Sequence, residues 1–293
     1  MQFILTLIAN PRHRALDTSM VDAVRRALGD ADAPAWLDPA VACDLATGAA
    51  NAAMTARAAL GSAPVDVVVQ EAGEPRRKRL LVADMDATMT EGETIDQLAE
   101  EAGIGPQIAA ITVRAMRGEL DFAAALSERT ALMAGLPEAA LSRVRARMRP
   151  MPGARALVQT MRRHGAHAAL VSGGFRVFTS HARTLIGFDE DHGNTVEVAD
   201  GRLTGRVIEP ILGRDAKLKL LQDTAAAQEC APAETMAVGD GANDLAMLQA
   251  AGMGVAIHAK PVVATAARAR VDHGDLTALL YIQGYRRDEF VEA

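Results

Sequence analysis

Four aspartates of the chain fall in two tight groups. Asp84 and Asp86 stand one residue apart directly after an apolar run, and Asp240 and Asp244 share one short glycine-rich segment. Carboxylates this close repel each other, so each requires a cation, a proton or several hydrogen-bond donors. Magnesium prefers oxygen ligands and is commonly shared between one or two carboxylates and a phosphate. The pattern therefore indicates a Mg²⁺ cofactor at these aspartates.

A serine and a lysine add groups that bind phosphate. Ser172 begins the run Ser-Gly-Gly, which offers a hydroxyl and backbone N–H groups, and Lys217 lies in an expected helix. A carboxylate nucleophile beside such groups suits phosphoryl transfer through an aspartyl-phosphate. In that chemistry Asp84 attacks phosphorus, and Asp86 protonates the leaving oxygen and then accepts a proton from water.

Each of these features also has a structural interpretation. Asp-x-Asp and Ser-Gly-Gly segments are common turns, and Lys217 beside Lys219 is compatible with a solvated helix face. Their placement favours chemistry, because the aspartates and the serine follow apolar runs at 80–83, 166–171 and 235–238 that predict buried strands. The carboxyl ends of parallel strands meet at one edge of a sheet, where ligands bind.

The rest of the segment after residue 74 supplies the elements that would position these groups. Its recurring strand, loop and helix pattern predicts an α/β domain with a Rossmann-like, doubly wound parallel sheet, and Asp200-Gly201 predicts a small β-hairpin over 195–207. Between about 92 and 149 the alternation gives way to amphipathic helices, expected at 94–102, 108–116, 122–132 and 137–148. We interpret this block as a helical cap inserted over the site.

The N-terminal region follows a different pattern. Strands expected at 3–9, 35–37, 41–45 and 65–69 alternate with helices at 17–28 and 49–60. The order β-α-β-β-α-β is that of an α+β ferredoxin-like fold. The polar segment after residue 70, with the basic run 76–79, predicts a solvated linker. We therefore expect domains at 1–73 and 74–293.

The motifs also carry a resemblance to a known family. Four segments resemble the four motifs of the haloacid dehalogenase (HAD) superfamily: Asp84-Met-Asp-Ala-Thr88, Ser172-Gly-Gly, Lys217, and Gly239-Asp-Gly-Ala-Asn-Asp244. The likeness extends to the cap, where Glu93-Thr-Ile-Asp, the segment from Arg114 to Phe122, and Arg129 stand at the spacings of the phosphoserine phosphatase branch. The N-terminal region resembles the small ACT-like domains of some of these enzymes, which implies a regulatory amino-acid site in that region.

The resemblance implies Mg²⁺-dependent hydrolysis of the small-molecule substrate O-phospho-L-serine to L-serine and phosphate, the last step of serine biosynthesis. It makes Asp84 the nucleophile and Asp86 the acid and base. The remaining implied roles are Mg²⁺ binding by the Asp84 carboxylate, the Asp86 carbonyl and Asp240; phosphate binding by Ser172, Gly173, Gly174, Lys217 and Asn243; binding of the serine ammonium by Glu93 and of its carboxylate by Arg129; lining of the lid by Met116 and Phe122; and support from Thr88 and Asp244.

One residue departs from the family pattern. Ala87 stands where the family usually has serine, which implies an altered rate or phosphate affinity rather than lost activity. Glu93 and Arg129, taken singly, are compatible with surface groups, and Met116 and Phe122 with the cap's own core.

Two other functions remain open at this point. A phosphatase or phosphotransferase of the same superfamily could use another small monophosphate such as phosphohomoserine, because one methylene changes binding by only about 1–3 kcal/mol. A signalling module, from another class, would keep the phosphate on Asp84. The presence of Asp86 disfavours that module, because a positioned base discharges the intermediate.

The composition of the chain limits the classes of partner that the protein is expected to bind. A chain of 293 residues with 49% hydrophobic content can bury a large core, and a net charge of −6 disfavours a nucleic-acid partner. Two distant cysteines without metal-ligand spacing favour a reduced, cytoplasmic location. The absence of a long apolar run disfavours a membrane partner. Pairing as a homodimer is left open.

Overall fold

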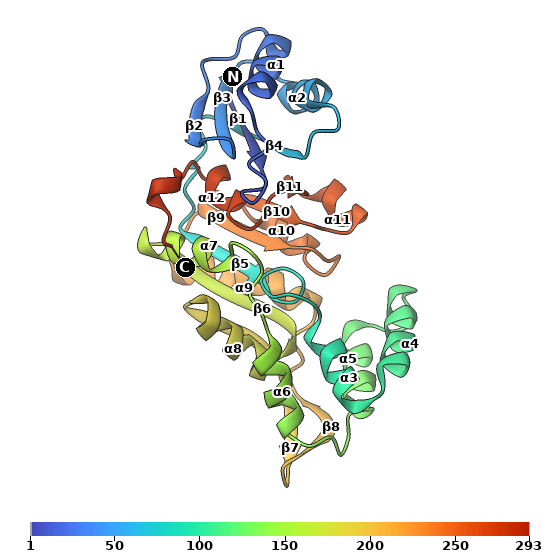
Figure 1. The fold of residues 1–293 in the computed structure, drawn as a ribbon. Helices are drawn as coiled ribbons and strands as arrows, with labels where there is room; N and C mark the ends of the chain where they lie inside the picture. The colour runs from blue at the N-terminus through green and yellow to red at the C-terminus, as the bar shows by residue number, and fades with distance from the viewer. Residues whose placement is uncertain (1, 293) are drawn as a thin grey trace.

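The chain forms two separate β-sheets with helices packed against each (Figure 1), in a computed structural model that describes residues 2–292 apart from the side chains of Met116 and Arg214. Figure 1 shows the smaller, N-terminal sheet at one end of the molecule, the larger sheet in the middle, and the inserted helices at the far side. No helix in the described part of the chain is both long and apolar enough to cross a bilayer.

The N-terminal unit has the expected order of elements. These are β1 (Phe3–Ala9), α1 (Thr18–Leu28), β2 (Ala35–Asp38), β3 (Ala42–Thr47), α2 (Ala52–Leu60) and β4 (Val65–Glu71), with the antiparallel strand order β2-β3-β1-β4. Successive side chains of β1 point to opposite faces of the sheet, and both faces are covered. Leu5 and Leu7 pack toward α1 and α2, whereas Ile8 joins the core of the larger unit.

The larger unit is built on a seven-stranded sheet. Its strands are β5 (Leu80–Asp84), β6 (His167–Phe175), β7 (Glu190–Ala199), β8 (Arg202–Ile208), β9 (Thr235–Gly239), β10 (Met253–Ile257) and β11 (Ala269–Val271), in the order β11-β10-β9-β5-β6-β7-β8. All neighbours are parallel except β7 and β8, which form the predicted hairpin. The prediction of a Rossmann-like α/β sheet is therefore confirmed.

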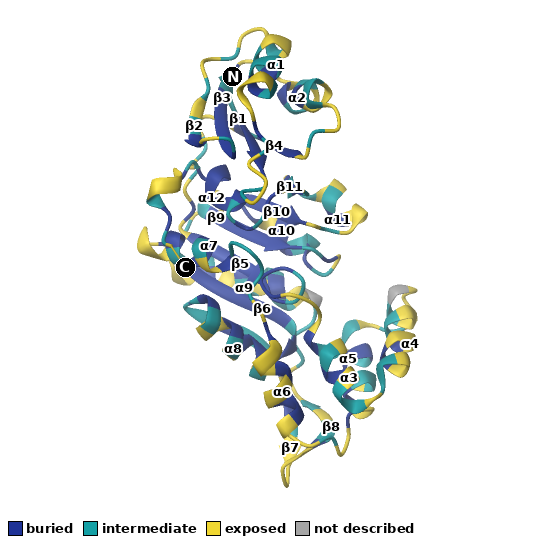
Figure 2. Cartoon of the chain, in the orientation of Figure 1, coloured by how far each residue is buried: buried dark blue, intermediate teal, exposed yellow. Residues whose placement is uncertain are grey.

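Helices cover both faces of this sheet. They are α7 (Ala154–Arg163), α8 (Arg176–Ile186), α9 (Arg214–Ala227), α10 (Leu245–Ala250), α11 (Pro261–Ala266) and α12 (Ala278–Ile282), with 3₁₀ turns at Pro232–Glu234 and Arg287–Glu289. Leu81 of β5 packs with α7, α8 and α12, whereas Leu80 packs with α9, α10 and α11. Figure 2 shows the central strands buried along their length, as expected for a strand covered on both faces.

Four helices are inserted between β5 and α7. They are α3 (Thr94–Ala102), α4 (Gly105–Met116), α5 (Phe122–Ala131) and α6 (Ala139–Arg147). The β7–β8 hairpin contacts this block, because Gly135 N–H donates to the Leu203 carbonyl at 2.8 Å and the Arg202 guanidinium donates to the Gly135 carbonyl at 2.7 Å. The hairpin thus braces the inserted helices.

The expectation of a solvated linker at 76–79 is wrong for Arg76 and Lys78, whereas Arg77 and Arg79 are exposed. Arg76 lies 2.7 Å from the Asp44 carboxylate of β3, and its guanidinium also donates to the Tyr281 and Ile282 carbonyls of α12. Lys78 is only 3% exposed and donates to two backbone carbonyls. The segment instead joins the two units through buried polar contacts, because the N-terminal sheet packs on α12.

Two further differences concern the second catalytic strand. The sequence predicts that this strand ends before Ser172, but β6 continues to Phe175 because Asn194 of β7 pairs with it beyond a register shift. The Asn194 amide also donates to the Gly173 carbonyl at 2.9 Å. Helix α8, which follows, was not expected.

Candidate active site

The predicted motifs meet at one edge of the large sheet. Strand β5 lies between β6 and β9, so Asp84 at its end is flanked by Val171, the residue before Ser172. On the other side, β9 ends at Gly239, directly before Asp240. Three segments that are far apart in the sequence are adjacent here because their strands are neighbours.

A buried lysine holds two of the carboxylates. The Lys217 ammonium lies 2.6 Å from Asp84 Oδ1 and 2.6 Å from Asp244 Oδ1, and all three side chains are less than a tenth exposed. The Asp84 carboxylate also accepts the Met85 N–H at 2.8 Å. Burial and then the Asp244 charge raise the pKa of Asp84, while Lys217 opposes this rise. Burial lowers the pKa of Lys217, but the two carboxylates together outweigh this effect and raise the pKa, which keeps the ammonium cationic.

Asp86 has a different environment. Its Oδ1 accepts the Thr94 N–H at 2.8 Å and its Oδ2 accepts the Ser172 hydroxyl at 2.8 Å. The Ser172 hydroxyl oxygen accepts the Gly174 N–H at 2.8 Å, which fixes the serine rotamer. Burial raises the pKa of Asp86, so its carboxyl group can hold a proton closer to neutral pH than an exposed aspartate does.

A cluster of three carboxylates fits a metal ion. Oxygens of Asp84, Asp240 and Asp244 lie within 4.8 Å of one another. Thr88 donates its hydroxyl to Asp240 at 3.1 Å, and Gly241 N–H donates to Asp244 at 3.0 Å. Burial and the Asp244 charge raise the pKa of Asp240, a sign of uncompensated negative charge. An all-oxygen site with excess negative charge suits a hard divalent cation.

A cavity of about 360 Å³ opens above these residues. It is lined by Asp84, Asp86, Glu93, Ile95, Asp96, Thr112, Phe122, Arg129, Ser172, Gly173, Gly174, Asp240, Gly241, Asn243 and Lys260. The sheet edge and the inserted helices both contribute to it. Lys217 and Asp244 are buried next to Asp84 and are not part of this lining. The expected binding of phosphate by Lys217 stays a prediction.

The side of the cavity formed by the inserted helices carries opposite charges. Burial, followed by the charges of Asp86 and Asp240, raises the pKa of Glu93 to about 7. Burial lowers the pKa of Arg129, whose Nε donates to the Ala125 carbonyl at 3.1 Å. Glu93 keeps solvent access, and Arg129 is partly buried. A carboxylate and a guanidinium in one cavity can hold the two charged groups of an amino acid.

Phe122 forms part of the wall of this cavity. A methyl group added at Gly173 would lie 2.8 Å from the Phe122 ring carbon Cε2, so the ring rests directly on the glycine backbone. Met116, the other expected lid residue, has its side chain outside the described residues. Ala87, where the family has serine, adopts φ 54° in the left-handed region, and its N–H donates to the Gly92 carbonyl at 3.1 Å. The effect of its missing hydroxyl stays a prediction.

Asp96, Thr112 and Lys260 line the cavity but were not predicted. Asp96 stands one helical turn after Glu93, so the spacing of three residues was a usable signal. Lys260 follows β10 without any motif, so only the fold brings it to the site.

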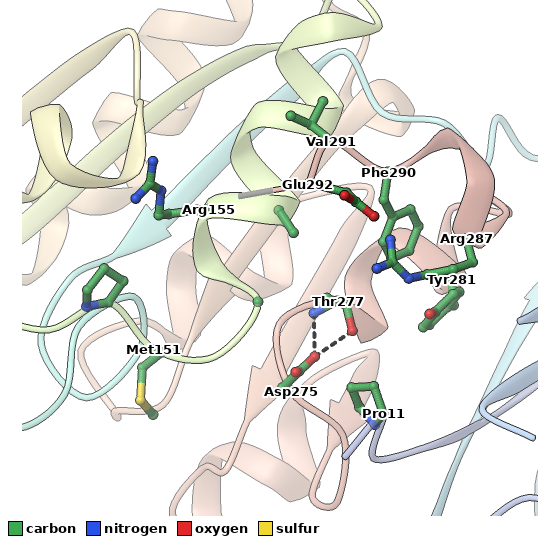
Figure 3. A pocket seen from close by; sticks show the side chains of 13 residues that line it. Pro11, Met151, Arg155, Asp275, Thr277, Tyr281, Arg287, Phe290, Val291 and Glu292 are labelled. Atoms are coloured by element: carbon green, nitrogen blue, oxygen red, sulfur yellow. Dashed lines mark hydrogen bonds between the residues drawn. The ribbon is translucent and has the colours of Figure 1, made fainter. Parts of the chain in front are cut away.

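A larger cavity of about 520 Å³ lies elsewhere (Figure 3). It is formed between Pro11 of the N-terminal unit, Met151 and Arg155 at the start of α7, and the C-terminal residues Arg287 and Glu292. None of the predicted catalytic residues is part of its described lining. The carboxylate, serine and lysine chemistry therefore belongs to the smaller cavity.

Comparisons with known proteins agree with this geometry. A phosphoserine phosphatase of Streptomyces coelicolor is 47% identical over 83% of this chain and 58% of that protein, and one of Streptococcus thermophilus is 44% identical over 70% of this chain and 95% of that protein. The chain spans only 56–63% of the length of the first curated relatives that it matches. 

The match to a solved structure extends over almost the whole chain. A HAD-family hydrolase from Salmonella enterica serovar Typhi superposes with a TM-score of 0.85 at 30% identity, over 96% of this chain and 98% of that one. The model of the haloacid dehalogenase-like hydrolases matches residues 81–249, which hold the expected catalytic motifs. The chain therefore belongs to the haloacid dehalogenase-like hydrolase family.

Proposed function

We propose that this protein hydrolyses O-phospho-L-serine to L-serine and phosphate with Mg²⁺ as cofactor. The observation that carries the proposal is the pairing of two aspartates with different partners under one cavity. Asp84 is held by a buried lysine and Asp86 by a serine hydroxyl and a backbone N–H, while Glu93 and Arg129 lie across the cavity. The names of the curated relatives support the same substrate.

The first step is attack by Asp84. A carboxylate oxygen of Asp84 forms a bond to phosphorus, and the bond from phosphorus to the serine oxygen breaks. Asp86 gives its proton to that leaving oxygen, so L-serine departs neutral at its hydroxyl. Lys217, 2.6 Å from Asp84, favours the anionic form of the nucleophile.

The second step releases phosphate. Asp86, now a carboxylate, takes a proton from a water molecule that attacks the aspartyl-phosphate, and Asp84 leaves as a carboxylate. The Ser172 hydroxyl and the Thr94 N–H keep Asp86 oriented through both steps. Backbone N–H groups near Gly173 and the side chain of Asn243 would bind the phosphoryl oxygens, a role that their positions in the cavity lining support.

The carboxylates of Asp84 and Asp240, with the Asp86 carbonyl, would hold Mg²⁺, and Asp244 would support them. When bound, the ion supplies positive charge that offsets these carboxylates and the phosphate. We further propose that the helical block at about 92–149 is the lid over this chemistry, since Phe122 meets the core at Gly173.

A panel of phosphomonoesters tests the substrate. We expect a higher kcat/KM for O-phospho-L-serine than for phosphoethanolamine or 3-phosphoglycerate, because only an amino-acid ester engages both Glu93 and Arg129. Phosphohomoserine engages both residues as well, so its kcat/KM should be lower only by the effect of one methylene, about 1–3 kcal/mol. A higher kcat/KM for phosphohomoserine would leave the proposed mechanism intact but would change the assigned substrate. One that prefers esters without an amino-acid group would overturn the roles of Glu93 and Arg129.

The raised pKa of Glu93 predicts that kcat/KM for phosphoserine depends on pH. Because burial raises this pKa to about 7, Glu93 loses its charge as the pH falls through neutrality and then binds the substrate ammonium less well. We expect kcat/KM to fall below about pH 7. Glu93→Gln should lower kcat/KM by about 10- to 100-fold at higher pH, and flatten this part of the profile.

The variant also serves as the control for that experiment. Titration of the substrate phosphate and of Asp86 is common to both proteins, so only the difference between the two pH profiles reports on Glu93. Parallel profiles, with the same fall below neutrality, would contradict the assignment of Glu93.

A methyl group at Gly173 tests the closed wall of the cavity. Gly173→Ala would place its Cβ against the Phe122 ring and displace the lid. We expect kcat/KM for phosphoserine to fall by about 10- to 100-fold, because small misplacements of binding groups have effects of this size. Gly105→Ala is the matched control, since an added Cβ meets nothing within 4 Å. Equal activity of the two variants would show that the contact is unimportant.

A further inference from the structure

Lys260 occupies a fixed backbone position beside the carboxylate cluster. Its N–H donates to the Asp240 carbonyl at 3.2 Å, and Pro261 begins helix α11 directly after it. The proline ring restricts the backbone at this point. The start of the Lys260 side chain is therefore tied to the loop that carries Asp240.

The charges that line the catalytic cavity are unbalanced. Five acidic side chains face it, from Asp84, Asp86, Glu93, Asp96 and Asp240, and even with Asp86 protonated they outnumber the cations of Arg129 and Lys260 in the described lining. The ammonium of Lys217 is buried beneath and already paired with two carboxylates. A phosphomonoester dianion entering this cavity meets strong repulsion unless cations offset it.

Lys260 is the lysine of the described lining, and its ammonium forms no ion pair with the described residues. Its residue is exposed, and within residues 2–292 its ammonium has no carboxylate within 4.0 Å, unlike Lys217. Its charge nevertheless reaches the cavity, because it acts on both Glu93 and Asp240 and lowers the pKa of each against the larger effect of burial. A long, unpaired side chain at a cavity mouth can follow an anion inward.

We propose that the Lys260 ammonium binds the phosphate dianion of the incoming substrate and attracts it into the carboxylate-lined cavity. The role deepens the proposed function and rests on it for the identity of the substrate. It differs from the role of Lys217, which supports the nucleophile from below. Attraction of this kind strengthens binding and association and weakens as salt screens the charges.

Kinetics of Lys260→Met tests the proposal. We expect kcat/KM for phosphoserine to fall about tenfold at low ionic strength, mainly through KM, with a smaller deficit at high salt. Lys260→Arg should retain most of the activity because it keeps the charge. Lys219→Met is the matched control, because it removes an equal charge from a side chain that is 74% exposed on α9, and its kinetics should equal those of the unmodified protein. Equal kinetics for Lys260→Met and Lys219→Met would overturn the proposal.

Binding of inorganic phosphate separates this role from the proposed function. In calorimetry with Mg²⁺ present, Lys260→Met should bind phosphate about tenfold more weakly than the Lys219→Met control, with an unchanged affinity for Mg²⁺ titrated alone. Weaker Mg²⁺ binding, or equal phosphate binding, would overturn the role of Lys260. If the unmodified protein does not hydrolyse phosphoserine, the proposed function fails, and the phosphate titration still decides the role of Lys260.

Discussion

Asp84→Asn should abolish phosphate release while leaving a folded protein. An amide of the same shape cannot attack phosphorus, so we expect kcat to fall on the order of 10⁴-fold or more, as for the loss of other covalent nucleophiles. The free energy of unfolding should not fall with it. Burial raises the pKa of Asp84, so the ionised carboxylate lowers the stability of the folded protein and an uncharged amide avoids that penalty. Lys217 also remains paired with Asp244 in the variant.

The matched control for this substitution is Asp223→Asn. Asp223 undergoes the same chemical change on α9, where its side chain is 60% exposed and paired with Lys219, so activity should be unchanged. Steady-state phosphate release and thermal unfolding of both variants supply the measurements. Residual turnover of Asp84→Asn within tenfold of the unmodified protein would mean that another group attacks phosphorus.

Lys217→Met should be the most destabilising single substitution at the site. It leaves the carboxylates of Asp84 and Asp244 buried without the ammonium that now lies 2.6 Å from each. Removing one partner from a buried ion pair lowers stability by about 3–5 kcal/mol. The surface change Lys219→Met, with an exposed side chain, should alter stability by no more than about 0.5 kcal/mol. Urea unfolding of both variants measures the difference.

The pH dependence of this deficit tests its electrostatic cause. Burial and Asp244 raise the pKa of Asp84, so the folded protein binds a proton there more tightly than the unfolded chain does. A raised carboxyl pKa means that stability falls as the pH rises from the unfolded pKa to the folded one. Without Lys217 to oppose that rise, the deficit should be smaller at about pH 5 than at about pH 8. A deficit independent of pH would indicate lost packing instead.

The site was predictable where local motifs coincide with strand ends. Asp84, Ser172 and Asp240 each follow an apolar run short enough to be a strand, and parallel strands place such residues at one edge. The structure confirms β5, β6 and β9 as neighbours. The contacts of Thr88 with Asp240, and of Asp86 with Ser172, join residues far apart in the sequence and could be seen only in the three-dimensional structure.

The features that sequence reasoning missed depend on tertiary packing. Helix α8 contains β-branched and aromatic residues of modest helix propensity, and it is stabilised by burying Phe178 and Ile186 against the sheet. Arg76 lies in a basic run that predicts solvent exposure, but Asp44 on a distant strand pairs with it. Lys260 belongs to no motif, because only the fold brings this residue, directly before α11, to the cavity.

Phosphate release from O-phospho-L-serine, measured with Mg²⁺ and after its removal with a chelator, tests the central proposal most directly. The structure predicts turnover with Mg²⁺ that disappears when the ion is removed and returns when it is added back, because the clustered carboxylates of Asp84 and Asp240 need a cation before a phosphate dianion can approach. Undiminished turnover in the absence of divalent ions, or no turnover of phosphoserine in their presence, would contradict it.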